Sequence, residues 1–202
     1  IKGVGQYQLT SGSVRVDAKR GRYAAADNQM VFVGSVFLRD IVADTLAKYQ
    51  IESDSMTVQL VDGVATEVYA GGAFKGRVVL STGDATSWLA SSRGIVVLED
   101  DQLSAVTLER DADVTYRYIT KDQVSRFRGD EMVLYFNTGI LQQVRVEGSA
   151  VLESRLVRAA GDMAINSGEG EEMDIYFDNG LLVRVEVGPK VEGIYLPQED
   201  AP

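Results

Sequence analysis

Residues 170–187 read GEEMDIYFDNGLLVRVEV and repeat the pattern of residues 129–148, GDEMVLYFNTGILQQVRVEG. In both stretches apolar positions alternate with other residues, which is the period-two pattern of a strand with one buried face. A short turn sequence, Asn-Thr-Gly in one and Asp-Asn-Gly in the other, supplies residues that accept positive backbone φ angles. The alternation then resumes, so each stretch predicts one β-hairpin.

The same pattern occurs upstream at a nearly constant spacing. Residues 53–72, SDSMTVQLVDGVATEVYAGG, form a third copy, and residues 94–112, GIVVLEDDQLSAVTLERDA, form a weaker copy whose turn lacks glycine. The copies step by 38, 38 and 41 residues, as measured from Met56, Gly94, Met132 and Met173. A second set of positions, which follows the return strands, also steps by 38: Gly34, Gly72, Arg110 and Gly148.

This spacing predicts about five units of about 38 residues, with residues 29–40 as the return strand of the first. Such repeats are typical of arrays in which each unit buries its apolar face on its neighbours. Segments beyond each hairpin add roughly one more strand per unit, whereas a propeller blade has four. We therefore predict an all-β fold: a repeat-built open β-jelly roll, or β-solenoid-like stack of antiparallel hairpins, with at most one short helix over residues 40–50.

The chain is expected to form a single domain over residues 1–196, followed by a frayed tail over residues 197–202. Residues 165–172, INSGEGEE, are expected to be a protruding connection between units. The first residue is Ile1 and no signal-type segment follows it, which we interpret as the start of a chain whose signal or anchor segment has been removed.

Composition argues against several classes of function. The net charge of −10 and the scattered Lys and Arg residues disfavour nucleic acid as a partner. The absence of Cys and His removes thiol nucleophiles, Cys/His metal sites and histidine proton transfer. No apolar run is long enough to span a membrane, and no phosphate-binding or dinucleotide motif is present. We expect no catalytic residues, no metal and no cofactor, and hence no enzyme.

Several phrases of the sequence resemble one known family. They are GRYAAADNQMVFVGSVFLRD, IESDSMTVQLVDGVATEVYAGGAF, the two hairpin stretches quoted above, and the ending EGIYLP. Together they resemble the OstA-like, LptA/LptC-like family of periplasmic lipopolysaccharide-transport proteins, especially its Bacteroidetes-type members, over about residues 12–196. The chain is longer and more acidic than the simplest members, which leaves open which component of a transport bridge it would be.

The resemblance implies a twisted, V-shaped β-jelly roll in the periplasm, which holds the acyl chains of lipopolysaccharide in a hydrophobic groove. It also implies assembly with other domains of the family, or with itself, by edge-strand addition, and an ATP-driven extractor elsewhere. Candidate lining residues are the apolar, alternating positions of the hairpins: Met30, Phe32, Val58, Leu60, Val68, Val96, Leu98, Val106, Leu108, Leu134, Phe136, Val144, Val146, Ile175, Phe177 and Val185.

Two other interpretations of these residues stay open. The same apolar faces are what an ordinary packed core requires, so a structural or adhesive β-repeat protein with a filled interior is the main alternative. A carbohydrate-active β-helix enzyme with two close carboxylates is the other, although no spacing singles out such a pair. Trp88 is expected to pack under a loop.

Overall fold

The computed structural model describes residues 7–11, 14–41, 47–80, 84–119, 122–137, 140–157, 163–178, 180–188 and 192–194. In these ranges the chain forms one 13-stranded sheet in which every pairing is antiparallel. This confirms the all-β prediction. The strands are β1 (Tyr7–Ser11), β2 (Val14–Ala18), β3 (Arg20–Ala24), β4 (Gln29–Asp40), β5 (Ala47–Val61), β6 (Val64–Leu80), β7 (Ala85–Glu99), β8 (Gln102–Tyr118), β9 (Gln123–Asn137), β10 (Ile140–Val157), β11 (Met163–Asp178), β12 (Leu181–Val187) and β13 (Glu192–Ile194).

The sheet is close to a simple meander. Its strands follow in the order β1-β2-β4-β5-β6-β7-β8-β9-β10-β11-β12, while β3 pairs with β4 and β13 with β11. The one helix in the described ranges is a 3-10 turn, η1 (Ala25–Asp27). Of the segment where a helix was expected, residues 47–50 belong to β5, and residues 42–46 lie outside the described residues.

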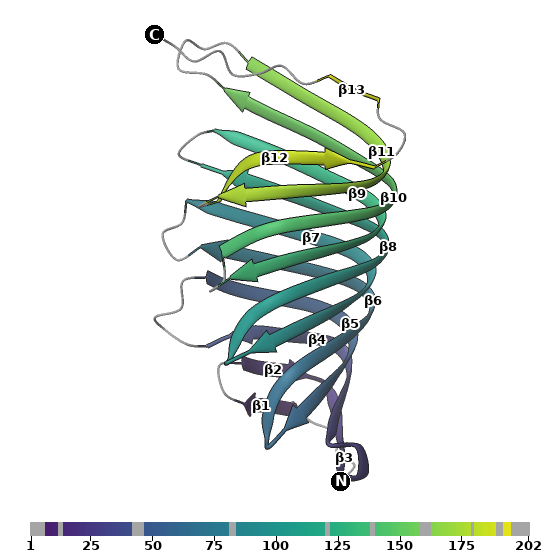
Figure 1. Ribbon diagram of the computed structural model, residues 1–202. Coiled ribbons are helices and arrows are strands. Elements are labelled where there is room, and N and C mark those ends of the chain that lie inside the picture. The colour runs from purple at the N-terminus through teal and green to yellow at the C-terminus, as the bar shows by residue number, and fades with distance from the viewer. Residues whose placement is uncertain are drawn as a thin grey trace.

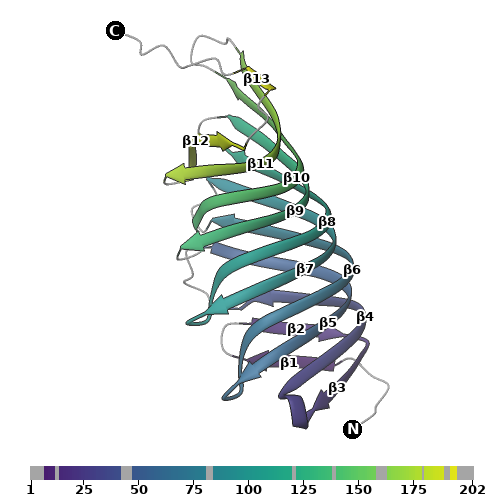
Figure 2. The same ribbon diagram turned by 45° about the vertical axis from the view of Figure 1, so that its right-hand side comes forward.

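The long strands fold the sheet over on itself. Strands β5 to β11 contain 15 to 18 residues each, which is well beyond the usual length. Each one bends midway, so that it runs through one layer, rounds a corner and continues in a second layer (Figure 1). The turned view shows the same two layers joined along one side (Figure 2).

We call these layers A and B and define them by their residues. Layer A contains residues 20–24, 29–33, 56–61, 64–71, 94–99, 102–109, 131–137, 140–147, 172–178 and 181–187. Layer B contains residues 7–11, 14–18, 36–40, 47–53, 74–80, 85–91, 112–118, 123–129, 150–157 and 163–170. The side opposite the corners, where the hairpin turns of both layers lie, is called the open edge (Figure 1).

The corners explain the 38-residue period. Two consecutive residues with positive φ occur at Gly34-Ser35, Gly72-Ala73, Arg110-Asp111 and Gly148-Ser149. The strand register shifts at the same places, as expected of β-bulges, which bend a strand and increase its twist. One such corner recurs on every second strand, so the repeating unit is a bent hairpin.

These corners correct two predictions about strand number and loops. The segments beyond each hairpin are not separate third strands, because they continue β4, β6, β8 and β10 past the corner. Residues 165–172 are not a protruding connection either. They form the middle of β11, and the half of that strand before the corner pairs with both β10 and β13.

A second bulge recurs beside the turns of layer A. The register shifts there leave one extra residue on each return strand, at Thr66, Ser104, Gln142 and Val183. At Val183 the side chain is consequently 59% exposed, although the alternation predicts an inward position. The bulge restores Val185 to the interior, where it packs against the core.

Candidate functional site

The candidate lining residues all face the space between the two layers. Each belongs to layer A, and each is a member of a single apolar core or is packed against it. Met30, Leu60 and Val185 are partly buried, and the others are buried. The inward face predicted from the alternation is therefore confirmed, while a role in binding lipid stays a prediction.

Phe136 and Tyr135 illustrate how sharply the two faces differ. Phe136 is 8% exposed and faces the interior, whereas the neighbouring Tyr135 is 41% exposed on the outer face of layer A. Because side chains alternate along a strand, adjacent residues sample opposite faces at almost the same place in the sheet. This pair is therefore suited to testing which face meets a ligand.

Layer B supplies a second wall that the sequence reasoning missed. Its buried apolar side chains include Val14, Val16, Val36, Leu38, Ile51, Phe74, Leu89, Val114, Phe127 and Leu152. The 38-residue spacing contains a signal for them, because Ile51, Leu89 and Phe127 recur at that period. Alternation alone hides this signal, because on these strands the inward positions change parity at the bend, as from Ile51 to Met56 and from Phe127 to Met132.

Among the described residues, the apolar side chains between the two layers are packed together in one buried core. A cavity of about 10 Å³ lies near the open edge, between Val78, Ala85, Ser87 and Tyr116 of layer B and Phe136, Ile140, Leu141 and Gly180 at the layer A side. That volume holds roughly one water molecule and not an acyl chain. The two layers are continuous along the corners, whereas at the open edge each layer ends in its own hairpin turns (Figure 1).

Aromatic contacts hold the layers together near the open edge. The ring of Phe177 in layer A meets the rings of Tyr116 and Phe127 in layer B edge-on, at centroid distances of 5.1 and 6.2 Å. The Tyr116 hydroxyl also donates a hydrogen bond to the carbonyl oxygen of Gly180. Burial of Tyr116, with a smaller contribution from Tyr118, raises the pKa of its hydroxyl above the ordinary value.

This contact predicts a loss of stability at alkaline pH. The folded protein keeps Tyr116 protonated, so its contribution is complete below the unfolded pKa of about 10 and declines as the pH rises above it. We expect the urea midpoint of the wild type to fall more between pH 9 and 11 than that of Tyr116→Phe. The exposed Tyr135→Phe serves as the control and should follow the wild type. An equal fall of the urea midpoint in the wild type and in Tyr116→Phe would contradict this role of the buried Tyr116 hydroxyl.

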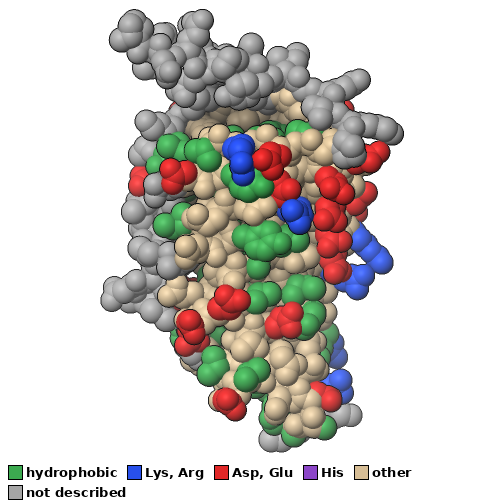
Figure 3. Space-filling model, viewed as in Figure 1, with side chains coloured by type: hydrophobic (Ala, Val, Ile, Leu, Met, Phe, Trp, Pro, Cys, Tyr) green, Lys and Arg blue, Asp and Glu red, His purple; other side chains and the backbone are tan. Residues whose placement is uncertain are grey.

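A row of glutamates lies on the outer surface of layer A beside the corner. Glu109, Glu131, Glu147 and Glu172 are direct register partners across β8 to β11 beside the corner, and acidic side chains gather along this side of the molecule (Figure 3). No group of Asp or Glu residues in the described ranges has an arrangement that could hold a metal ion. Like charges directly opposite one another destabilise a sheet, so this ladder is not explained by stability.

The outer face of layer B carries basic side chains and Trp88. Trp88 is the fourth residue of β7, paired with Arg77 and Thr115, and is 41% exposed. The expectation that it packs under a loop is wrong, because its side chain is exposed on the outer face of a strand. Its fluorescence therefore reports on the outer surface and not on the interior.

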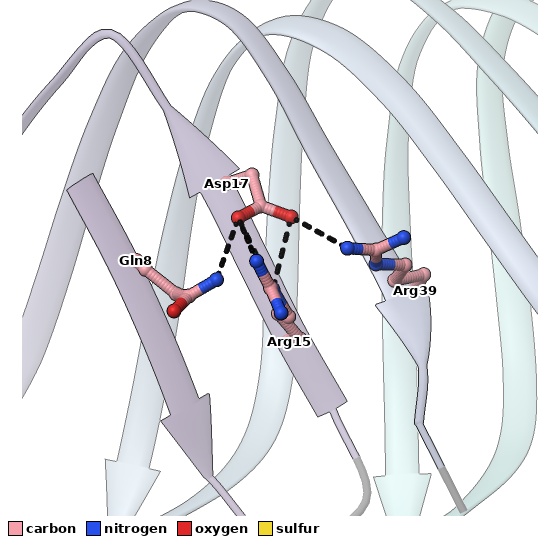
Figure 4. Close-up of polar contacts among 4 residues, drawn as sticks. All are labelled: Gln8, Arg15, Asp17 and Arg39. Carbon is pink, nitrogen blue, oxygen red and sulfur yellow. Dashed lines mark hydrogen bonds and ion pairs between the residues drawn. The ribbon is translucent and has the colours of Figure 1, made fainter. Parts of the chain in front are cut away.

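An ion-pair cluster secures the N-terminal edge of the sheet. Asp17 on β2 accepts hydrogen bonds from Gln8 on β1, at 3.0 Å, and from Arg15, at 3.1 Å, and it pairs with Arg39 on β4 at 3.3 Å (Figure 4). These side chains are partly exposed, and such pairs contribute about 0–1 kcal/mol each. The cluster links three neighbouring strands, which favours a structural role.

The fold and the site define a class: a single antiparallel sheet rolled around a closed apolar interior. No protein-family model matches the chain, and no curated protein matches it. One similar solved structure is the crystal structure of LptH of Pseudomonas aeruginosa, described as the LptA homologous periplasmic component of the conserved lipopolysaccharide transport device. The match covers 93% of this chain and 100% of that chain, with 11% identity and a TM-score of 0.33, and gives this chain neither a family nor a function. In the described ranges, no helix has the length and apolar character needed to cross a membrane.

Proposed function

We propose that this chain is a non-enzymatic periplasmic protein that binds lipopolysaccharide, holds its acyl chains between the two layers and passes them to a similar domain. One observation carries the proposal: the inward side chains of layer A form a continuous apolar face from β4 to β12, across the strands and along the roll. The quoted phrases that resemble the OstA-like family support the same function. The repeats of the protein stack along the roll and so lengthen this apolar face. An acyl chain would lie along it.

The binding energy would come from replacing one apolar contact by another. Parting the layers exposes side chains that are packed in the free protein, and acyl chains would cover them again. Burial of each methylene contributes about 0.8 kcal/mol, so several long chains offset both the lost contacts and the repulsion between anionic head groups and an acidic protein. The interior would then act as a passage whose walls close when the ligand leaves.

The two ends of the sheet offer a route for the transfer. Among the described strands of layer A, β3 pairs only with β4, and β12 pairs only with β11. Each end strand therefore has a second edge whose backbone groups can pair with a strand of another domain. A similar domain, or a second copy, added at such an edge would continue the apolar face of layer A across the junction.

Photocrosslinking from inside the roll tests this function. A photoreactive residue at position 136 should yield an adduct with labelled lipopolysaccharide in cells, whereas one at position 135 should not, because Phe136 and Tyr135 face opposite sides of the same strand. Each variant must be folded and abundant, and crosslinking must be demonstrated at another site. Absence of an adduct at position 136 under those conditions would overturn the proposal.

The closed interior favours one alternative. With a cavity of about 10 Å³, the chain could be a structural or adhesive β-repeat protein whose interior never opens. That function predicts no adduct at position 136 and no binding of acyl chains by the purified protein. The same crosslinking experiment therefore separates the two functions.

A further inference from the structure

In the described ranges, the buried polar side chains lie in layer B, and four neighbouring residues with hydroxyl groups form a strip there. On layer B, Ser87, Tyr116, Ser125 and Ser154 are successive register partners across β7, β8, β9 and β10. We call these four residues the hydroxyl row. All of them are buried, and neighbouring strands place them about 4.8 Å apart along the roll. The candidate lining residues of layer A are all apolar, so the two walls differ in chemistry.

Contacts within the hydroxyl row use only part of its hydrogen-bonding capacity. The Ser125 and Ser154 hydroxyls are 2.8 Å apart, and Gln123 donates to Ser125 at 3.3 Å. A serine hydroxyl is one donor and has two acceptor lone pairs, so the bond between the two serines uses one of their two hydrogens. Buried polar groups are costly unless they are bonded, and serine is mostly an exposed residue. The two serines thus bond each other in the free protein and keep spare hydrogen-bonding capacity that a ligand hydroxyl could use.

The position of the row agrees with a ligand site. The small cavity near the open edge borders on the row at Ser87 and Tyr116. Opposite these residues, the cavity is bounded by Phe136 and Leu141 at layer A. A chain that enters at the open edge would thus lie between an apolar wall and a wall with hydroxyl groups.

We propose that the hydroxyl row makes the interior selective for acyl chains that bear a hydroxyl group. This inference rests on the proposed function and specifies the chemistry of its ligand. A hydroxyl on the chain would donate to, or accept from, Ser125 and Ser154, while the hydrocarbon on either side packs against layer A. A plain chain fills the same space but leaves the serines without that partner.

Binding of two matched acids tests the selectivity. The full chain is titrated with 3-hydroxytetradecanoic acid and with tetradecanoic acid, each in competition with a fluorescent acyl probe. One neutral hydrogen bond is worth about fivefold in affinity, so the wild type should prefer the hydroxy acid by about that factor. In S125A/S154A the preference should disappear, and tetradecanoic acid should bind at least as well as it does to the wild type.

The variants keep the test independent of folding. Replacing both serines together leaves neither partner of their mutual bond unsatisfied, which limits the cost to the long hydrogen bond that Gln123 donates to Ser125 at 3.3 Å. A thermal melt measures that cost. Ser53→Ala removes another buried interior hydroxyl, which bonds the carbonyl of Ser55 at 2.8 Å outside the row, and it should retain the preference. If neither acid binds the wild type, the proposed function itself fails. If both acids bind equally, or if S125A/S154A retains the preference, acyl binding stands and the role of the row is overturned.

Discussion

Replacing Gly148 by alanine is expected to lower the free energy of unfolding by about 2–5 kcal/mol, through backbone strain and steric overlap. Gly148 has φ +69° at the corner of β10, a conformation that costs other residues energy. A β-carbon at position 148 would also lie 2.8 Å from the β-carbon of Asp130 on β9. That atom is attached to the backbone, so a side-chain rotation of Asp130 cannot move it away. Urea unfolding of the purified protein measures the effect.

Gly63 provides the matched control for this prediction. It has φ +81° in the turn between β5 and β6, and a β-carbon there would meet no atom within 4 Å. Gly63→Ala should therefore show only the backbone cost, about 1–2 kcal/mol. Adding Asp130→Gly to Gly148→Ala removes the overlapping side chain. The double variant should therefore lose less stability than the sum of the losses of the two single variants, as a double-mutant cycle would show. Equal losses for Gly63→Ala and Gly148→Ala would contradict the crowding at the corner.

The corner also marks the limit of what could be predicted from the sequence. The alternation of Met132, Leu134 and Phe136 identifies the inward face of layer A, because a strand with one buried face has a period of two. The spacing of Gly34, Gly72 and Gly148 was visible as well. The structural meaning of this spacing could not be predicted, because a pair of positive-φ residues can make a turn, a bulge or a corner. Only the pairing of neighbouring strands distinguishes these. The weaker copy over residues 94–112 has Arg110 at this position with φ 63°, so even glycine is not a constant marker.

Layer B and the closure of the interior were beyond local patterns for a related reason. Val114 lies beyond the corner of β8, where exposed residues separate it from Leu108, and Phe127 lies before the bend of β9, where the inward positions change parity between Phe127 and Met132. Contacts between Phe177 and the rings of Tyr116 and Phe127 join residues from different strands and layers. Alternation predicts that such residues are inside, but not whether they meet one another or leave a groove between them.

Phe177→Ala is expected to cost about 3–5 kcal/mol in stability and, on the proposed function, to increase the affinity for a fluorescent acyl probe. Phe177 fills the space between the layers near the open edge, where it contacts Tyr116 and Phe127. Removing its ring leaves a cavity and fewer contacts to break when the layers part. Both effects lower the cost of admitting a chain, although Phe177 is itself a candidate lining residue. Urea unfolding and probe titration measure the two quantities separately.

Phe74→Ala distinguishes entry at the open edge from a general loosening of the core. Phe74 is equally suited to leave a cavity, because it is buried, but it lies directly after the Gly72-Ala73 corner with its ring against Gly94. Phe74→Ala should lose about as much stability as Phe177→Ala, through the same loss of buried area. Its affinity for the acyl probe should not increase. A gain in both variants would mean that destabilisation alone admits the probe. No gain in either, with both proteins folded, would contradict the idea that the contacts of Phe177 control access to the interior.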